Sequence, residues 1–296
     1  LARRVAGKRA AMSKPIDFAA WLALGRVSNV PTVWTNLLAG LAVGGALIAP
    51  GPMRSGLADA LLSAWGLFIG VSFLYIAGMV LNDVCDVAVD RAERPQRPLP
   101  SGRVKWNHAF AFVIVVGLAG VALIATGGWL PAALGIALAI TIIAYNTLHT
   151  ATGWSVLLMG ICRGWVCALG ITWVAGINVL AWPAWLLPVI MTAYTVMITV
   201  AARGEASDMP RWQCAGRAVA WVMLLVPAGV AWLFWQPPHA NGLLLLALLL
   251  VVAWLARSLW LLSRKPPMIG PAVGGYLAGF CLIDGLLLLM FGLPIA

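Results

Sequence analysis

Acidic side chains are scarce in this chain of 296 residues, which has only 9 Asp and Glu residues against 19 Lys and Arg. Charged residues make up 9% of the sequence, whereas soluble domains contain about 25%. Too little polar surface is available to solvate a globule of this size, so the composition excludes soluble, disordered and secreted disulfide-rich proteins. With 62% hydrophobic residues, the chain is predicted to be an integral membrane protein.

Cysteine pairs are also missing. No two of the 5 cysteines form a Cys-x-x-Cys pair, and no histidine lies at ligand spacing from any of them. A zinc site or a redox couple is therefore not indicated, and the cysteines are interpreted as small apolar packing residues. In a membrane protein the basic excess first sets orientation, so no nucleic-acid partner is expected.

Nine stretches are apolar over enough length to span a bilayer, which takes about 20 residues. They are residues 18–48, 57–81, 108–126, 130–148, 156–177, 183–202, 218–235, 242–262 and 269–293. The first contains polar residues and a proline, so we expect it to bend or to pack around a polar group. The predicted fold is all-α, a polytopic bundle of nine transmembrane helices.

The basic residues alternate strictly between the two sides of these spans. Sixteen of the 19 fall in the N-terminal arm and in the regions after the second, sixth and eighth spans, whereas the loops of the opposite side hold one, Arg54. By the positive-inside rule the crowded side is cytoplasmic. We therefore expect a bacterial-type inner membrane protein with a cytoplasmic N-terminus. Residues 1–16 would be a basic arm on anionic membrane lipid, and residues 17–296 the transmembrane domain.

Most of the acids gather in two clusters on the predicted cytoplasmic side. Asp83, Asp86 and Asp90 stand at i, i+3 and i+7, which predicts that they share one helical face. Asn82 is on the same side of that helix. Three like charges on one stripe repel one another, and Mg²⁺ with oxygen ligands is the natural cation to neutralise them. Carboxylates beside a hydrophobic bundle are functional candidates by default.

The second cluster consists of Glu205 and Asp208, at i and i+3, which are expected to form a second wall of the metal site. Basic residues crowd both clusters, with Arg203 and Arg211 beside this one. Interfacial salt bridges alone explain such an arrangement poorly, because the acids are closely aligned and the bases are numerous. A metal on the acids, with phosphate oxygens bridging it to Arg and Lys, accounts for both. The pattern predicts a phosphate-bearing ligand in a membrane-embedded pocket.

The sequence of residues 82–102, NDVCDVAVDRAERPQRPLPSG, resembles the first aspartate-rich motif of the UbiA superfamily of intramembrane prenyltransferases. The polar stretch RVSNVPTVWTN at residues 26–36 is similar, more weakly, to the first helix of that family. Members are nine-helix bundles around a central cavity. The resemblance implies that a polyprenyl diphosphate lies with its tail between the helices and that two Asp-rich motifs hold its head through Mg²⁺. Ionisation then gives an allylic cation that reacts with a hydrophobic acceptor.

The resemblance also implies roles for individual residues. The catalytic residues would be Asp83, Asp86, Asp90 and Asn82. The metal ligands would be Asp83, Asp86, Asp90, Glu205 and Asp208. The diphosphate would be bound by a set of polar and basic residues: Arg94, Arg97, Lys105, Arg203, Arg163, Asn29 and Tyr145.

Two positions depart from the family pattern. The second motif usually carries aspartates as DxxxD or DxxD, whereas this chain has RGEASD at residues 203–208. Quinone-type members show a lysine shortly after a tyrosine, but here Tyr145 is followed by His149. These differences argue mildly against a mainstream ubiquinone or menaquinone enzyme and leave the acceptor and the number of Mg²⁺ ions open.

Alternatives remain at the level of function. An intramembrane terpene cyclase would use the same cation without an external acceptor. A transporter or lipid-binding protein could keep the fold without the chemistry, but it should show paired broken helices and charges near the midplane. The acids here cluster at one surface, which favours catalysis.

Three polar residues inside the spans have open interpretations. Arg163 is costly unless it faces a cavity, and it is interpreted as a contact to the diphosphate or the acceptor, or as the partner of a helix-end carbonyl. Asn36 is expected to hold helices together rather than to bind substrate. Asp284, in the last span, has no obvious neighbour in the sequence.

Overall fold

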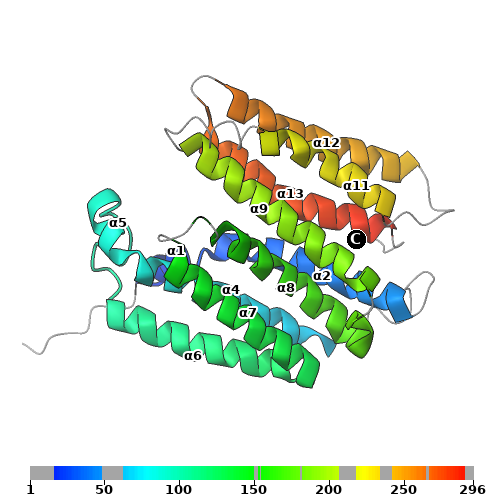
Figure 1. Ribbon diagram of the computed structural model, residues 1–296. Coiled ribbons are helices and arrows are strands. Elements are labelled where there is room, and N and C mark those ends of the chain that lie inside the picture. Colours follow the sequence, from blue (N-terminus) through cyan, green and yellow to red (C-terminus); the bar gives the residue numbers. More distant parts are fainter. Residues whose placement is uncertain are drawn as a thin grey trace, which may run out of the picture.

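The computed structural model of the chain describes residues 17–48, 63–149, 153, 155–180, 182–206, 218–233, 242–264 and 267–290. Within these ranges the only regular secondary structure is helix, and the helices run side by side in one bundle (Figure 1). The predicted basic arm, residues 1–16, lies outside the described residues.

Eight helices in the described part of the chain are long and apolar enough to cross a membrane. Their cores are α2 (Val30–Ile48), α4 (Trp65–Cys85), α6 (Trp106–Ala125), α7 (Trp129–Leu148), α8 (Ser155–Ala175), α9 (Leu186–Ala206), α12 (Gly242–Ser263) and α13 (Ile269–Met290). The remaining predicted span, 218–235, corresponds to a shorter apolar helix, Ala218–Trp232. The all-α, multi-pass fold is confirmed, whereas the count of nine spans and the cytoplasmic N-terminus stay predictions.

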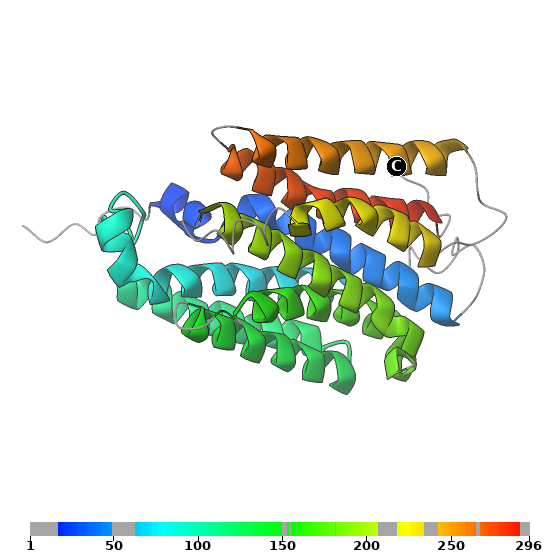
Figure 2. The same cartoon turned by 45° about the horizontal axis from the view of Figure 1, so that its top comes forward.

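Shorter helical elements connect these spans. They are α1 (Phe18–Leu24), η1 (Val27–Asn29), α5 (Val87–Glu93), η2 (Gly176–Leu180), η3 (Trp182–Trp185), η4 (Met223–Leu225) and α11 (Val226–Leu233). Both views of the bundle show α1 and α5 at the same end (Figures 1 and 2).

The predicted bend of the first span is confirmed, because α1 ends at Leu24 and α2 begins at Val30. Between them Arg26 adopts φ 44° and ψ 44°, the left-handed region. Among the described residues it is the only non-glycine residue with a positive φ. Such a conformation is unfavourable for a side chain with a Cβ and is typically kept at functional sites.

The bundle has α2 and α8 at its centre, with α6 and α7 on one side and α12 on the other (Figure 2). Closely packed pairs include α2 with α8, α4 with α6, α8 with α9, and α12 with α13. The outer helices expose large apolar side chains, for example Val115 and Leu118 on α6 and Leu249 and Leu250 on α12. Such faces suit contact with lipid, where exposed apolar area costs nothing.

The contact between α2 and α8 depends on glycine. A Cβ added at Gly170 would lie 2.6 Å from the Leu37 carbonyl oxygen and 3.0 Å from the Gly40 Cα. A Cβ at Gly117, in the middle of α6, would meet only the Ala77 Cβ at 3.9 Å, an ordinary contact. Close backbone approach through small residues is a general device of membrane helices.

The Gly170→Ala substitution is therefore expected to destabilise the protein by about 1–3 kcal/mol, the usual cost of overpacking. Gly117→Ala is expected to be neutral or slightly stabilising, because alanine is the better helix former wherever its methyl group fits. Apparent melting temperatures in detergent, followed by circular dichroism, measure the contrast. Equal melting temperatures for the two variants would show that the helices separate easily.

Candidate active site

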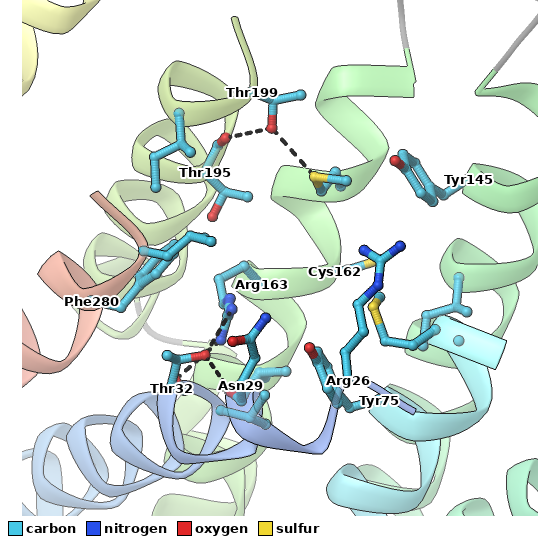
Figure 3. A pocket seen from close by; sticks show the side chains of 18 of the residues that line it. Arg26, Asn29, Thr32, Tyr75, Tyr145, Cys162, Arg163, Thr195, Thr199 and Phe280 are labelled. Carbon is cyan, nitrogen blue, oxygen red and sulfur yellow. Dashed lines mark hydrogen bonds between the residues drawn. The ribbon is translucent and has the colours of Figure 1, made fainter. Parts of the chain in front are cut away.

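A cavity of about 370 Å³ lies between α2, α4, α7, α8, α9 and α13 (Figure 3). Most of its lining is aliphatic or aromatic. Polar groups project into it from five of these helices, all but α13, and from the break before α2: Arg26, Asn29, Thr32, Tyr75, Tyr145, Asn146, Arg163, Thr195 and Thr199. A largely apolar hollow with a few polar groups is typical of a binding site for a hydrophobic ligand.

The aspartates lie at the junction of α4 and α5. Helix α4 continues to Cys85, so that Asp83 is in its last turn, and Asp90 is in α5. At Asp86, between the two helices, the backbone has φ −85° and ψ 0°. The expected stripe on one uninterrupted helix is therefore wrong in detail, because the regular helix breaks at Asp86, which contacts His149. Asp83 and Asp90 nevertheless share a partner, Arg97.

Arg97 joins two of these carboxylates. Its Nη1 lies 2.7 Å from Oδ2 of Asp90 and 3.5 Å from Oδ1 of Asp83. Nη1 of Arg94 is 3.8 Å from Oδ1 of Asp90. Asp83 and Asp90 are 6% and 2% exposed, respectively. Two buried carboxylates therefore share one guanidinium, which offsets their desolvation and mutual repulsion.

Arg26 links this cluster to the cavity. Its Nη2 lies 3.6 Å from Oδ1 of Asp83, and its side chain lines the cavity. Sequence reasoning did not place Arg26 in the site. The available signal was an arginine inside a predicted span, which is costly unless it has a function.

Asp86 pairs with His149 instead of with an arginine. Nε2 of His149 lies 2.9 Å from Oδ1 of Asp86. The His149 ring stacks on Tyr145, with ring centroids 5.5 Å apart, and Tyr145 lines the cavity. The hydroxyl of Ser155, the first residue of α8, donates to the His149 carbonyl oxygen at 3.4 Å. The ends of α4 and α7 and the start of α8 therefore meet at one mouth.

Asp83 and Asp90 thus have arginine partners, and Asp86 contacts His149. The described residues contain no group of three or more His, Cys, Asp or Glu side chains that could hold a metal ion as they stand. Carboxylate oxygens are nevertheless the donors that Mg²⁺ prefers, so the residues fit the ion in type. The side chain of Glu205 and the whole of Asp208, predicted as a second wall, lie outside the described residues.

Five of the seven predicted diphosphate ligands lie in the site, in two groups. Asn29, Tyr145 and Arg163 line the cavity, whereas Arg94 and Arg97 contact the aspartates. The two others do neither. Lys105 is exposed at the start of α6, and Arg203 donates from Nη2 to the Ser155 hydroxyl at 3.0 Å, next to the mouth.

Arg163 is held deep in the cavity wall (Figure 3). Its Nη1 donates to the Thr32 carbonyl oxygen at 3.1 Å and to Oδ1 of Asn36 at 2.9 Å. Its Nη2 donates to the Thr32 hydroxyl at 3.2 Å, and its Cζ lies 4.4 Å from the centroid of the Phe280 ring. The side chain thus contacts a backbone carbonyl in the first turn of α2 and lines the cavity. Its contact to the diphosphate or to the acceptor stays a prediction.

Asp284, for which the sequence indicates no neighbour, has a hydrogen-bond partner in the fold. Its Oδ2 accepts a hydrogen bond of 2.6 Å from Nδ2 of Asn36, and both residues are fully buried. Asn36 therefore connects α2 to α8 and α13, which confirms its expected role of holding helices together. Asn36 and Asp284 are 248 positions apart, which explains why the sequence indicated no contact between them.

A separate ion pair fixes the start of α1. Nε of Arg103 donates to Oδ2 of Asp17 at 2.8 Å, and the Ala20 N–H donates to Oδ1 of the same carboxylate at 3.0 Å. The hydrogen bond from Arg103, and to a smaller extent the one from Ala20, holds the pKa of Asp17 below its usual range. The pair ties α1 to the loop that carries Arg97 without lining the cavity.

The described residues thus form a helical membrane bundle with buried carboxylates and arginines at the mouth of a largely apolar cavity, which defines the class of the protein by its fold. The model of the UbiA prenyltransferase family matches residues 37–268. The chain belongs to this family.

Individual relatives cover less of the chain. A 4-hydroxybenzoate octaprenyltransferase of Vibrio vulnificus is 31% identical over 130 residues, 43% of this chain and 45% of that protein. A digeranylgeranylglyceryl phosphate synthase of Sulfurisphaera tokodaii is 44% identical over 55 residues, 19% of this chain and 20% of that protein. The chain thus spans less than half the length of these curated relatives. The apo structure of a UbiA homolog from Aeropyrum pernix has a TM-score of 0.65 at 18% identity, covering 87% of this chain and 97% of that one, which shows the shared fold.

Proposed function

We propose that this chain transfers a prenyl group from a polyprenyl diphosphate to a hydrophobic acceptor within the membrane, in a reaction that requires Mg²⁺. The observation that carries the proposal is the position of Arg26, which lines the apolar cavity of about 370 Å³ and also contacts the buried Asp83. Membership of the UbiA prenyltransferase family supports it, as does the similarity to a relative named as an octaprenyltransferase.

The cavity would hold the reacting end of the prenyl chain. Its aliphatic walls exclude water, which would otherwise capture an allylic cation. The rings of Tyr75 and Phe280 line it, and aromatic faces stabilise cations. The cavity walls and the outer faces of the bundle are both apolar, so the prenylated product would leave the cavity into lipid.

The head group would bind at the mouth through an exchange of partners. Asp83, Asp86 and Asp90 would hold Mg²⁺, which supplies positive charge against the leaving diphosphate oxygens. Asn82 would orient these carboxylates, and Glu205 and Asp208 would add further oxygen ligands for the ion. Because Asp83 and Asp90 are already paired with arginines, their charges stay compensated when the ligand is absent.

The cationic side chains released by this exchange would turn to the diphosphate oxygens. Arg97 and Arg94 would do so from the aspartate cluster, with Lys105 and Arg203 at the rim, and Asn29 and Tyr145 on the cavity side. Arginine suits this role because its planar group donates two parallel hydrogen bonds to a phosphate. In a bacterial-type inner membrane the mouth would lie on the cytoplasmic side, as the distribution of basic residues predicts.

The test uses the purified chain in liposomes with geranyl, farnesyl and geranylgeranyl diphosphates, with and without a membrane lipid extract. We expect Mg²⁺-dependent release of pyrophosphate and, with the extract, a prenylated product identified by mass spectrometry. A cyclic hydrocarbon formed without the extract would indicate a terpene cyclase instead. No release from any of the three diphosphates would contradict an enzymatic role.

A further inference from the structure

Two N–H groups of Arg163 have no hydrogen-bond partner among the residues that the structure describes. Its Nη1 donates both hydrogens, to the Thr32 carbonyl oxygen and to Asn36, and its Nη2 donates one to the Thr32 hydroxyl. Within the described part of the chain, Nε–H and the second Nη2–H have no hydrogen-bond partner. These two hydrogens point in parallel from one edge of the guanidinium plane. That edge matches the two oxygens of an anion such as a carboxylate.

The guanidinium is also rigidly placed. Asn36 accepts from Arg163 with its amide oxygen and donates to Asp284 with its amide nitrogen, at 2.9 and 2.6 Å. The carboxylate of Asp284 therefore fixes which end of the Asn36 amide faces the arginine. Phe280 covers one face of the guanidinium at 4.4 Å. Four groups from α2 and α13 thus orient one cation on α8.

The location of Arg163 separates it from the aspartate mouth. It follows Ser155 by eight residues on α8, which corresponds to about 12 Å along the helix axis. Ser155 is at the mouth, because its hydroxyl contacts the carbonyl oxygen of His149, which pairs with Asp86. A head group held by the aspartates therefore leaves Arg163 facing the deeper part of the cavity.

A second substrate must enter that deeper part. Its nucleophile has to lie about 3–3.5 Å from the carbon that it attacks, so its remaining atoms extend beside the diphosphate head into the cavity. A polar end of this molecule would be costly to bury unless it met a partner. The guanidinium carries one positive charge, and the nearby buried carboxylate of Asp284 is hydrogen-bonded to Asn36 and not to the arginine. A singly charged carboxylate therefore suits the two remaining N–H groups better than a phosphate monoester, whose charge is close to two.

We propose that Arg163 binds a carboxylate of the acceptor substrate through its Nε–H and Nη2–H, and that Asn36 and Asp284 are positioning residues for it. The inference rests on the proposed function and names the chemical class of the acceptor. It assigns Arg163 to the acceptor instead of to the diphosphate, one of the two ligand roles left open by the sequence.

The test measures binding of three small probes to the purified full chain in nanodiscs by calorimetry: benzoate, its neutral amide benzamide, and phenyl phosphate. The wild-type chain is expected to bind benzoate at least about 10-fold more tightly than benzamide, the effect of a charge-assisted pair of hydrogen bonds. Phenyl phosphate is expected to bind less tightly than benzoate. Equal affinities for benzoate and benzamide, or a preference for phenyl phosphate, would overturn the carboxylate assignment.

Arg163→Lys keeps the charge but loses the parallel N–H pair, so the preference for benzoate should fall to within about 3-fold. The affinity of this variant for geranyl diphosphate should stay within about 3-fold of the wild-type value. That result would also show that the variant is folded. The matched control is Arg257→Lys, whose arginine lies on α12 over Trp254 and does not line the cavity. It should retain the full preference. A loss of geranyl diphosphate binding in Arg163→Lys, with benzoate binding unchanged, would assign the residue to the diphosphate.

The positioning role is tested by rescue. Asp284→Asn retains an oxygen that can accept from Asn36, whereas Asp284→Leu does not. Benzoate affinity should fall in the leucine variant and recover largely in the asparagine variant, with geranyl diphosphate affinity steady in both. Equal losses for both probes in both variants would contradict a positioning role. Failure of the proposed function would be recognised separately, as absence of Mg²⁺-dependent pyrophosphate release by the wild-type chain.

Discussion

Replacing Asp83 with asparagine is expected to lower Mg²⁺-dependent pyrophosphate release by at least about 100-fold, the scale of losing one preorganised electrostatic contact to the developing charge. The carboxylate lies between Arg97 and Arg26, at 3.5 and 3.6 Å, and is 6% exposed. Asparagine fills the same volume but removes the charge that a bound cation needs. The measurement is pyrophosphate released from farnesyl diphosphate by purified protein in detergent, with Mg²⁺ or with a chelator.

The matched control for this variant is Asp17→Asn. Asp17 belongs to the same end of the bundle but pairs with Arg103 and lies outside the cavity lining. Asparagine is as good an N-cap as aspartate, so α1 should keep its start and activity should remain within about 2-fold of the wild type. If the Asp83→Asn variant released pyrophosphate at the wild-type rate and had an unchanged melting temperature, Asp83 would not be a catalytic residue.

Hydropathy predicted the spans well where a helix is apolar to its ends. The predicted 242–262 and 108–126 correspond to Gly242–Ser263 and Trp106–Ala125. The second span was predicted to end at 81, but α4 runs to Cys85. Hydropathy falls at Asn82 and Asp83, although the helix continues, because arginines from elsewhere in the chain compensate the buried carboxylate. Partners that are distant in the sequence are invisible to a local average.

The same reason limits prediction of the site. Spacing alone assigned Asp83, Asp86 and Asp90 to one face, since i, i+3 and i+7 coincide only on an uninterrupted helix. The departure from helix at Asp86 and its pairing with His149 depend on where α7 ends. The contact of Asn36 with Asp284 depends on the approach of α13 to α2. Residue types predicted the chemistry, but only the fold decides which groups meet.

Arg97→Gln is expected to destabilise the protein by up to about 3 kcal/mol, because removal of one partner leaves buried carboxylates uncompensated. Arg97 is the shared partner of Asp90, at 2.7 Å, and of Asp83, at 3.5 Å, and its own side chain is only 26% exposed. Added Mg²⁺ should raise the apparent melting temperature of the variant more than that of the wild type, since the two freed carboxylates are the proposed metal ligands. The control is Arg91→Gln, an exposed arginine of the neighbouring α5, which should behave as wild type with and without Mg²⁺. A variant at Arg97 that Mg²⁺ stabilises no more than the wild type would show that these two carboxylates do not bind the ion, and the partner exchange proposed at the mouth would then be wrong.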